Sequence, residues 1–195
     1  AKDVLGRITQ FRVYWNYYWR YESAIRAGHA DVGLKIYPRD GRYYYIGGAN
    51  IGSDVDRNRH GTDYAQKNRV DGLLGFEKGP FDLGVGVIRS GGGARLTVTP
   101  FWRNSIGKRF SVFAQGYDFG RNRTVEGRVF DSPVYDFGML AKVTRWFGIG
   151  ARVEDINETK RGQVWARIQF EDTDVAYLFG MASFGAAGSK GRSKK

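Results

Sequence analysis

The chain of 195 residues suits one domain, and its formal net charge is +11. It contains no cysteine, which excludes a disulfide framework, a catalytic thiolate and a cysteine-based zinc site. No stretch approaches the roughly 18 consecutive apolar residues of a membrane-spanning helix, which excludes a helical membrane protein. A β-barrel is not excluded, because its lumen-facing polar residues dilute the hydropathy.

Apolar and polar residues alternate in segments of roughly ten residues, the length that a tilted strand needs to cross a bilayer. This period of two indicates strands and not helices. In residues 81–87, for example, Phe81, Leu83 and Val85 alternate with aspartate and glycine. In chain order, the predicted strands are 11–20, 30–36, 42–51, 69–77, 81–87, 95–103, 109–115, 136–143, 149–154 and 164–170.

The links between these strands follow an approximate pattern of alternating short turns and longer loops. Residues 38–41 and 78–80 contain the Pro and Gly residues typical of tight turns, whereas 52–61 and 121–132 read as polar loops. The short link at 90–93, which contains a run of three glycines, breaks this pattern, and we predict a tight hairpin link there instead of a phosphate-binding loop. Such one-sided turns and loops are typical of outer-membrane barrels.

The end of the chain decides the number of strands. After residue 171, Asp and Thr precede an apolar stretch, which reads as a helix N-cap and an amphipathic helical turn. Because bacterial single-chain barrels have even strand numbers, we predict an all-β antiparallel transmembrane barrel of ten strands with a short C-terminal helix. Twelve strands, with one segment split, is the alternative. The predicted regions are a lead-in at 1–7, the barrel at 8–171, a short amphipathic segment at 172–184 and a basic flexible tail at 185–195.

The alternation assigns a charged face to the lumen and an apolar face to lipid. The lipid-facing set includes Leu83, Val85, Val98, Ile149 and Ile168. Two roles are open for the lumen set: a lining that conducts or selects, or a self-neutralising network that fills a narrow barrel, and we favour the network because buried charge is tolerated when it is paired. The lumen set is Asp31, Lys35, Arg69, Asp71, Glu77, Asp82, Arg95, Arg103, Arg109, Asp136, Lys142, Arg152, Glu154 and Arg167.

The aromatic residues admit two roles, as stacking platforms for bases or sugars and as an interfacial girdle in the headgroup layer, and we favour the girdle. The predicted girdle residues are Trp15, Tyr17, Trp19, Tyr43, Tyr44, Tyr45, Trp102, Phe137 and Trp146.

Nucleic-acid binding and catalysis receive little support from the sequence. The arginines are interleaved with Asp and Glu along the strands and do not form one basic run. The only histidines, His29 and His60, lie in no nucleophile motif and not at metal-binding spacing. We therefore expect no nucleic-acid partner, no catalytic residues, no cofactor and no metal.

Five phrases in order make the chain similar to the C-terminal β-barrel region of mammalian-cell-entry (MCE) family proteins of diderm bacteria. They are LKIYPRDGRYYYIG at 34–47, GVIRSGGG at 86–93, YDFGR at 117–121, IGARVEDI at 149–156 and FEDTDVAYLFG at 170–180. The MCE ring domain and its membrane anchor are missing from this chain.

The resemblance implies a function in phospholipid transport between the inner and outer membranes. The expected role is to anchor or dock the outer end of an MCE-type transport system in the bacterial outer membrane, with phospholipid and MCE-domain regions or other lipid-transport subunits as partners. The alternative is an independent small porin or an adhesin-like barrel. Ala1 begins no signal peptide, so we expect an exported chain whose leader has been removed, or part of a longer protein.

Overall fold

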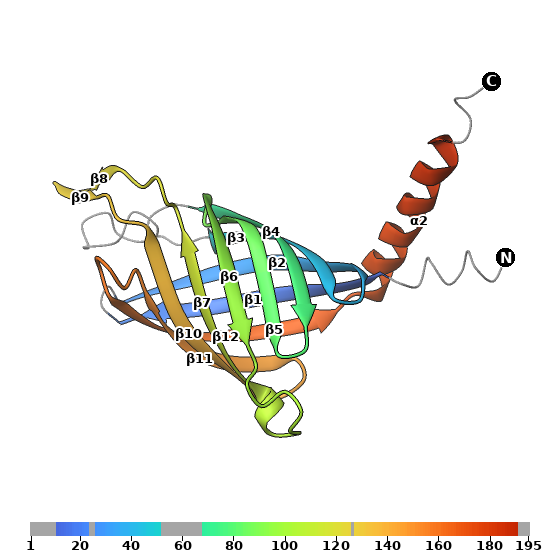
Figure 1. Ribbon diagram of the computed structural model, residues 1–195, viewed down its shortest axis with the longest axis horizontal. Helices are drawn as coiled ribbons and strands as arrows, with labels where there is room; N and C mark the ends of the chain where they lie inside the picture. Colours follow the sequence, from blue (N-terminus) through green and yellow to red (C-terminus); the bar gives the residue numbers. More distant parts are fainter. Residues whose placement is uncertain (1–10, 24–25, 52–67, 126, 191–195) are drawn as a thin grey trace.

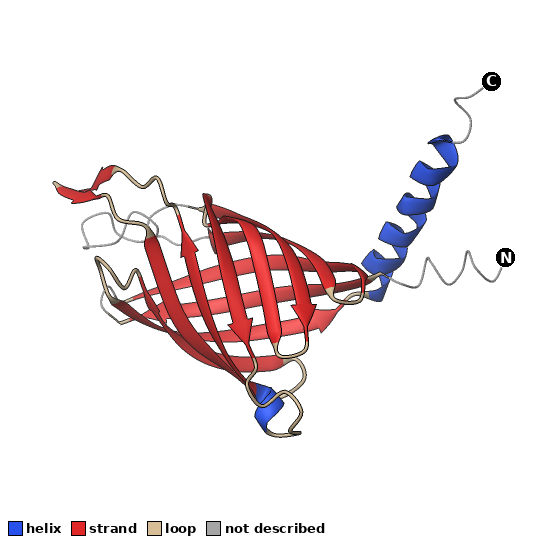
Figure 2. Cartoon of the chain, viewed as in Figure 1, coloured by secondary structure: helices blue, strands red, loops and turns tan. Residues whose placement is uncertain are grey.

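The computed structural model describes residues 11–23, 26–51, 68–125 and 127–190, and in these ranges the chain forms a closed antiparallel barrel of ten strands (Figures 1 and 2). The barrel strands are β1 (Arg12–Glu22), β2 (Ala27–Arg39), β3 (Arg42–Ile51), β4 (Arg69–Lys78), β5 (Phe81–Ile88), β6 (Gly91–Val98), β7 (Phe110–Tyr117), β10 (Val134–Lys142), β11 (Phe147–Glu154) and β12 (Arg161–Glu171). Each strand pairs with its sequence neighbour in the barrel, and β1 closes the barrel by pairing with β12. The predicted ten-stranded antiparallel barrel is confirmed.

Two short elements lie in the links between barrel strands. A separate hairpin, β8 (Arg123–Val125) and β9 (Arg128–Phe130), extends from one end of the barrel in Figure 1. A short 3₁₀ helix, η1 (Gly107–Arg109), lies in the link between β6 and β7 near the opposite end. We call these the loop end and the turn end. The predicted polar loop at 52–61 lies outside the described residues.

The C-terminal helix α2 (Thr173–Lys190) begins next to the turn end and projects away from the barrel. The Asp172 side chain accepts a hydrogen bond from the backbone N–H of Val175 at 2.9 Å and a second from Trp15 Nε1 at 2.9 Å. The helix packs on β1 and β2 through Ala176 against Val13. It is longer than predicted and not amphipathic, because apolar residues occupy its exposed as well as its packed sides. In the described part of the chain, no helix has the length and apolar character needed to span a membrane.

Strand register separates the side chains into an inner and an outer set. Val85 pairs with Leu74 and Ala94, whereas the adjacent Gly84 pairs with Gly75 and Arg95. Val85 is 40% exposed on the outer wall, and Arg95 lines the interior. Side chains alternate between faces of a sheet, so the same separation extends around the barrel. The interior is therefore polar and the outer wall apolar.

Glycine makes room inside the barrel for two tyrosine rings. A Cβ at Gly75 would lie 1.9–2.3 Å from ring atoms of Tyr43, and one at Gly33 would lie 2.1–2.5 Å from the Tyr45 side chain. Both tyrosines are buried, in a cluster that also contains Tyr37. The glycines thus let aromatic side chains lie flat against the inner wall.

A tight hairpin link between β5 and β6 is confirmed, but it begins one residue before the predicted range 90–93, and the glycine run at 91–93 belongs to strand β6. The turn consists of Arg89 and Ser90, whose φ angles of 48° and 66° are the left-handed values that a type I′ hairpin turn requires. Gly93 is needed for packing, because a Cβ there would lie 2.4 Å from the carbonyl oxygen of Gly116. The close approach of β7 explains the glycine.

Candidate functional site

Arg20 organises the ion pairs of the lumen beside β1 and β2. Its Nε and Nη2 atoms donate to the two carboxylate oxygens of Asp31, each at 2.7 Å, and Nη2 also donates to Asn50 Oδ1 at 2.5 Å. The backbone N–H of Asn50 donates to Asp31 at 2.9 Å. Arg20 and Asn50 are fully enclosed. Asp31 therefore has a two-pronged charged partner and a backbone donor, the arrangement that makes a buried carboxylate tolerable.

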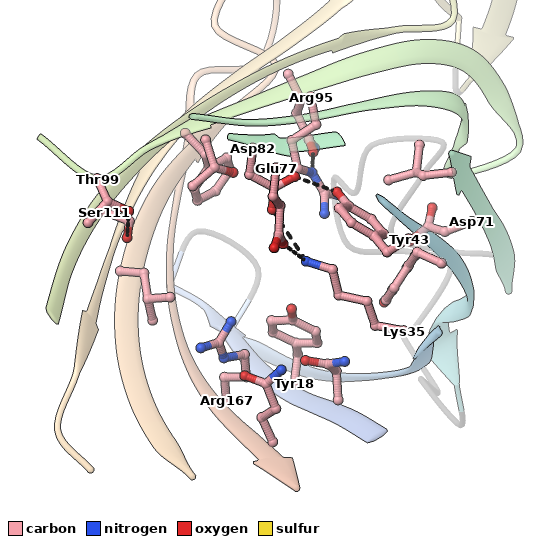
Figure 3. A pocket seen from close by; sticks show the side chains of 18 of the residues that line it. Tyr18, Lys35, Tyr43, Asp71, Glu77, Asp82, Arg95, Thr99, Ser111 and Arg167 are labelled. Carbon is pink, nitrogen blue, oxygen red and sulfur yellow. Dashed lines mark hydrogen bonds and ion pairs between the residues drawn. The ribbon is translucent and has the colours of Figure 1, made fainter. Parts of the chain in front are cut away.

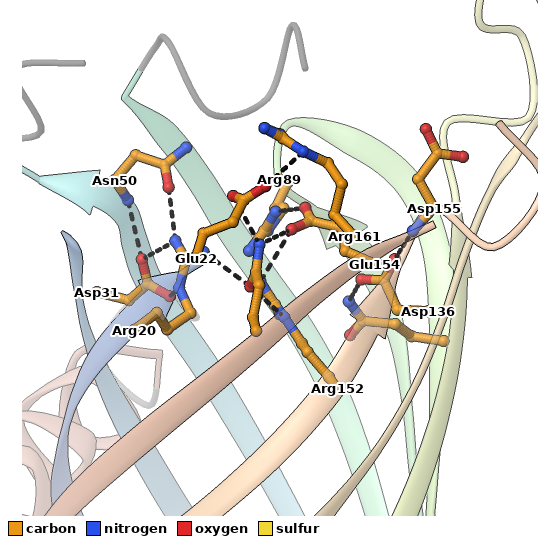
Figure 4. Close-up of polar contacts among 12 residues, drawn as sticks. Arg20, Glu22, Asp31, Asn50, Arg89, Asp136, Arg152, Glu154, Asp155 and Arg161 are labelled. Carbon is orange, nitrogen blue, oxygen red and sulfur yellow. Dashed lines mark hydrogen bonds and ion pairs between the residues drawn. The ribbon is translucent and has the colours of Figure 1, made fainter. Parts of the chain in front are cut away.

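Glu154 is the centre of a second group of charges, on β11 (Figure 4). Its carboxylate forms a short contact with Arg89 from the β5–β6 turn and accepts a short hydrogen bond from Gln163 on β12. Arg152 donates to it from two residues away at 3.5 Å. Glu22 accepts from Gln163 at 3.2 Å and pairs with Arg161. Side chains from four regions of the wall thus meet across the lumen.

The network continues to the loops beyond the strands. Gln115 donates to Asp136 at 2.6 Å, and the backbone N–H of Asp155 donates to the same carboxylate at 2.9 Å. Asp155 also pairs with Arg121 at 3.1 Å, and both side chains are almost completely buried. Burial raises the pKa of the Asp155 carboxyl above its ordinary value, although the hydrogen bond from Arg121 opposes this shift. The loop end is therefore tied to the wall by buried charges.

A different cluster lies nearer the turn end (Figure 3). Lys35 donates to Glu77 at 2.6 Å and to Asp82 at 3.3 Å. Tyr37 donates to Glu77 and Tyr43 donates to Asp82, both at 2.6 Å. The Lys35 ammonium group also lies 3.7 Å from the centroid of the Tyr43 ring, within the range of a cation–π contact. The five residues of this cluster come from β2, β3, β4 and β5.

A cavity of about 430 Å³ inside the barrel is lined by side chains of these charge groups and by side chains of β10 and β12. Arg20, Arg89 and Arg152 line it on the loop side, and Pro80, with its neighbours at the β4–β5 turn, lines it on the turn side. The volume falls within the roughly 300–1,000 Å³ typical of small-molecule sites. The interior is therefore filled by a charge network at one end and contains space for a polar ligand at the other.

Most of the predicted lumen residues point inward. Nine of them line the cavity, and Asp136 and Glu154 are buried in the loop-end network. Arg69 has the inward register, opposite Ala49. The nine lining residues are Asp31, Lys35, Asp71, Glu77, Asp82, Arg95, Lys142, Arg152 and Arg167.

Arg103 and Arg109 lie outside the lumen, and their assignment to it is wrong. β6 ends at Val98, and Pro100 begins a link of turns, so the expected strand does not reach Arg103. Proline lacks the N–H that would continue the ladder. Arg103 is exposed and stacks on Trp102, and Arg109 is exposed in η1.

Two of the predicted girdle residues are also misplaced. Tyr43 and Tyr45 are buried in the lumen, whereas Tyr44 between them is 46% exposed on the outer wall. A run of three consecutive tyrosines in one strand must divide between the two faces. Alternation alone was enough to identify this division.

Several residues of the loop-end network do not belong to the predicted lumen set. Arg20 and Glu22 share the inward parity of Asn16, so the alternation on β1 contained the signal. Gln163 on β12 is also buried in this network, and because it carries no charge it was not identified as part of a charged lumen set. Arg89 gave no sequence signal, since its inward position depends on the left-handed turn. No cluster of three or more potential metal ligands occurs among the residues that the structure describes.

Residues 13–177 match the family model of a lipocalin-like domain. No curated protein matches the chain. This family is different from the MCE family, so the resemblance drawn from the five short phrases is wrong. Phrases such as YDFGR and GVIRSGGG combine glycine, aromatic and charged residues, as the alternating strands and turns of a barrel generally require.

Proposed function

The chain belongs to the lipocalin-like domain family, and from the polarity of its barrel we propose that it is an integral β-barrel of a bacterial outer membrane. Its role in this proposal is that of a closed anchor, with the phospholipid of the bilayer as its surroundings. Phospholipid transfer was expected only from the MCE resemblance, which is wrong, so it is not part of the proposal. No catalytic step is part of the proposal.

The observation that carries the proposal is the inverted distribution of polarity. A barrel in water places its apolar side chains inside, but here Arg, Asp and Glu occupy the interior. Large apolar side chains are exposed around the wall: Leu83, Val85 and Val87 on β5, Phe137 and Met139 on β10, Ile149 and Val153 on β11, and Val164, Ile168 and Phe170 on β12. Exposed apolar patches larger than a few hundred Å² mark an interaction or membrane surface. A band on nearly every strand favours lipid over one protein partner.

The aromatic side chains of the outer wall add to this support. Trp19 is 57% exposed on β1 and Trp146 is 52% exposed in the β10–β11 turn. Tyr and Trp place a polar atom at the headgroup level while their rings contact the acyl chains. Residues near both ends of the barrel therefore suit two interfacial girdles.

The closed lumen favours an anchor over a channel. Arg20, Arg89 and Glu154 are each less than 5% exposed, and their contacts join β1, β2, the β5–β6 turn, β11 and β12 across the interior. A barrel of ten strands encloses little more space than a barrel of eight strands, and side chains fill the lumen of an eight-stranded barrel. An ion crossing the barrel would have to break several of these pairs.

A soluble small-molecule-binding barrel is the second candidate function. Two observations favour it: the family match and the cavity of about 430 Å³. Barrels of the lipocalin type hold one small ligand in the interior. This candidate predicts a folded monomer in plain buffer, in spite of the apolar outer wall.

Single-channel recording in a planar bilayer tests the closed-anchor proposal. The parent protein is expected to give no steady conductance. Arg89→Ala combined with Glu154→Ala removes the central pair and is expected to produce channel openings. Arg12→Ala with Asp40→Ala is the matched control, because it removes an exposed pair of 2.7 Å and is expected to stay silent. Steady conductance of the parent protein would identify a pore and contradict the proposal.

A further inference from the structure

Two cations in the cavity lack a partner in the described part of the chain. Lys142 on β10 and Arg167 on β12 both line the cavity, and neither forms an ion pair or a hydrogen bond within the described ranges. Their charges repel, and Lys35 adds to the positive field at Lys142. Lys142 is exposed and Arg167 is half-buried, so both cations can be reached by solutes, and an occupant of opposite charge would be attracted to them.

Strand register places the two cations on either side of a glycine. Lys142 pairs with Gly148, and Gly148 pairs with Arg167 on the next strand. Two strand spacings put their Cα atoms about 10 Å apart. A Cβ at Gly148 would lie 2.9 Å from Leu140 Cδ1, so Leu140 covers the glycine and the two long side chains line the cavity on either side of it. The β10–β11–β12 wall therefore presents an Arg fork and a Lys ammonium group to the same space.

Trp165 adds an aromatic ring to this wall of the cavity. It is 8% exposed, lines the cavity two residues before Arg167, and its Nε1 has no hydrogen-bond partner within the described ranges. Its ring covers Gly150, where a Cβ would lie 2.4 Å from it. Because Nε1 itself has almost no accessible surface, the indole borders the cavity through its ring and not through its N–H.

The carboxylates of the cavity are already engaged elsewhere. Asp31 is held by Arg20, and Glu77 and Asp82 share Lys35 on the facing wall. Asp71 accepts the backbone N–H of Arg89 at 2.5 Å. Glu77 and Asp82 attract Lys142 electrostatically at longer range, without a hydrogen bond to it in the described part of the chain. The donors of the β10–β12 wall therefore remain available to a ligand.

We propose that this cavity binds a phosphate group, held by Lys142 and Arg167, which enters from the turn end. Phosphate oxygens accept hydrogen bonds from the planar Arg fork and from a point-charge ammonium, so the two cations can hold one group together. The group belongs either to a small phosphorylated molecule or to a phospholipid headgroup. The inference goes beyond the proposed anchor and does not depend on it, because the cavity lies inside the barrel.

Isothermal titration calorimetry of the folded full chain tests the proposal with three probes: inorganic phosphate, glycerol 3-phosphate and dihexanoyl phosphatidic acid. The parent is expected to bind at least one probe saturably. K142Q combined with R167Q is expected to weaken binding about tenfold or more, because two charge-assisted contacts are lost. K108Q combined with R109Q is the matched control: it makes the same change of charge at exposed sites in η1 and is expected to bind within about twofold of the parent.

Circular dichroism establishes that each variant folds, and K142Q alone replaces the double variant if the latter does not fold. Saturable binding of inorganic phosphate or glycerol 3-phosphate assigns the site to small phosphorylated molecules, whereas binding of phosphatidic acid alone assigns it to a lipid headgroup. Absence of saturable binding by all three probes, or parent-like affinity of the variant without the cations, would overturn the proposal.

Discussion

An arginine in the middle of the outer wall distinguishes a lipid-facing surface from a water-facing one. Val85 lies near the centre of β5, is 40% exposed, and pairs with the apolar Leu74 and Ala94. In a bilayer, Val85→Arg places a charge near the midplane, which costs about 2–4 kcal/mol in outer-membrane barrels. In water the same exposed substitution changes stability by about 0.5 kcal/mol at most.

Urea titration of protein folded into lipid vesicles measures this difference, with heat-modifiable gel mobility as the readout of folding. The expected decrease of about 2–4 kcal/mol corresponds to a change of roughly 30-fold to 1,000-fold in the folding equilibrium. Ile106→Arg is the matched control, because Ile106 is 69% exposed in the β6–β7 link at the turn end. Its expected cost is about 0–1 kcal/mol. Equal effects of the two substitutions would refute the lipid-facing assignment of Val85.

Three other predictions concern the lumen and the helix. Glu154→Gln is expected to lower the free energy of unfolding by about 3–5 kcal/mol in a urea titration, because the arginines around it lose their buried counter-charge. Gly75→Ala is expected to cost about 1–3 kcal/mol through overlap with Tyr43, whereas Gly72→Ala on the same strand, where an added Cβ would meet no heavy atom within 4 Å, is expected to cost less than half as much. The backbone N–H hydrogen bond in the first turn of α2 holds the pKa of Asp172 below its ordinary value of 3.8, so the stabilisation is present above that value and is lost as the pH falls through the lower pKa of the folded state. Tryptophan fluorescence from about pH 5 to pH 2 should show this transition, and Asp172→Asn should remove it.

Period-two patterning was sufficient to predict the barrel. Each side chain's face follows from parity, so ten strands and the inward position of residues such as Asp82 were predictable. The predictions that were wrong concern strand ends, because parity does not indicate the residue at which a strand ends. Pro100 ends the ladder before Arg103, and the left-handed pair Arg89 and Ser90 makes the turn that was predicted at 90–93.

The site was predictable as a set of inward charges but not as a set of partners. Partners depend on which strands face one another across the lumen, and closure of β1 on β12 brings Glu22 to Gln163, far apart in the sequence. The isolation of Lys142 and Arg167 is likewise a property of the closed barrel, because it follows from the positions of the facing carboxylates. Family membership was not predictable from short phrases, since any alternating barrel strand produces similar ones.

Folding in plain buffer compared with folding in lipid vesicles tests the central claim most directly. The chain is refolded from urea into each, and folding is followed by circular dichroism and by heat-modifiable gel mobility. The account predicts a folded barrel only in lipid vesicles, since the apolar outer wall requires an apolar solvent. A folded monomer in plain buffer would contradict membrane insertion and favour the soluble binding barrel.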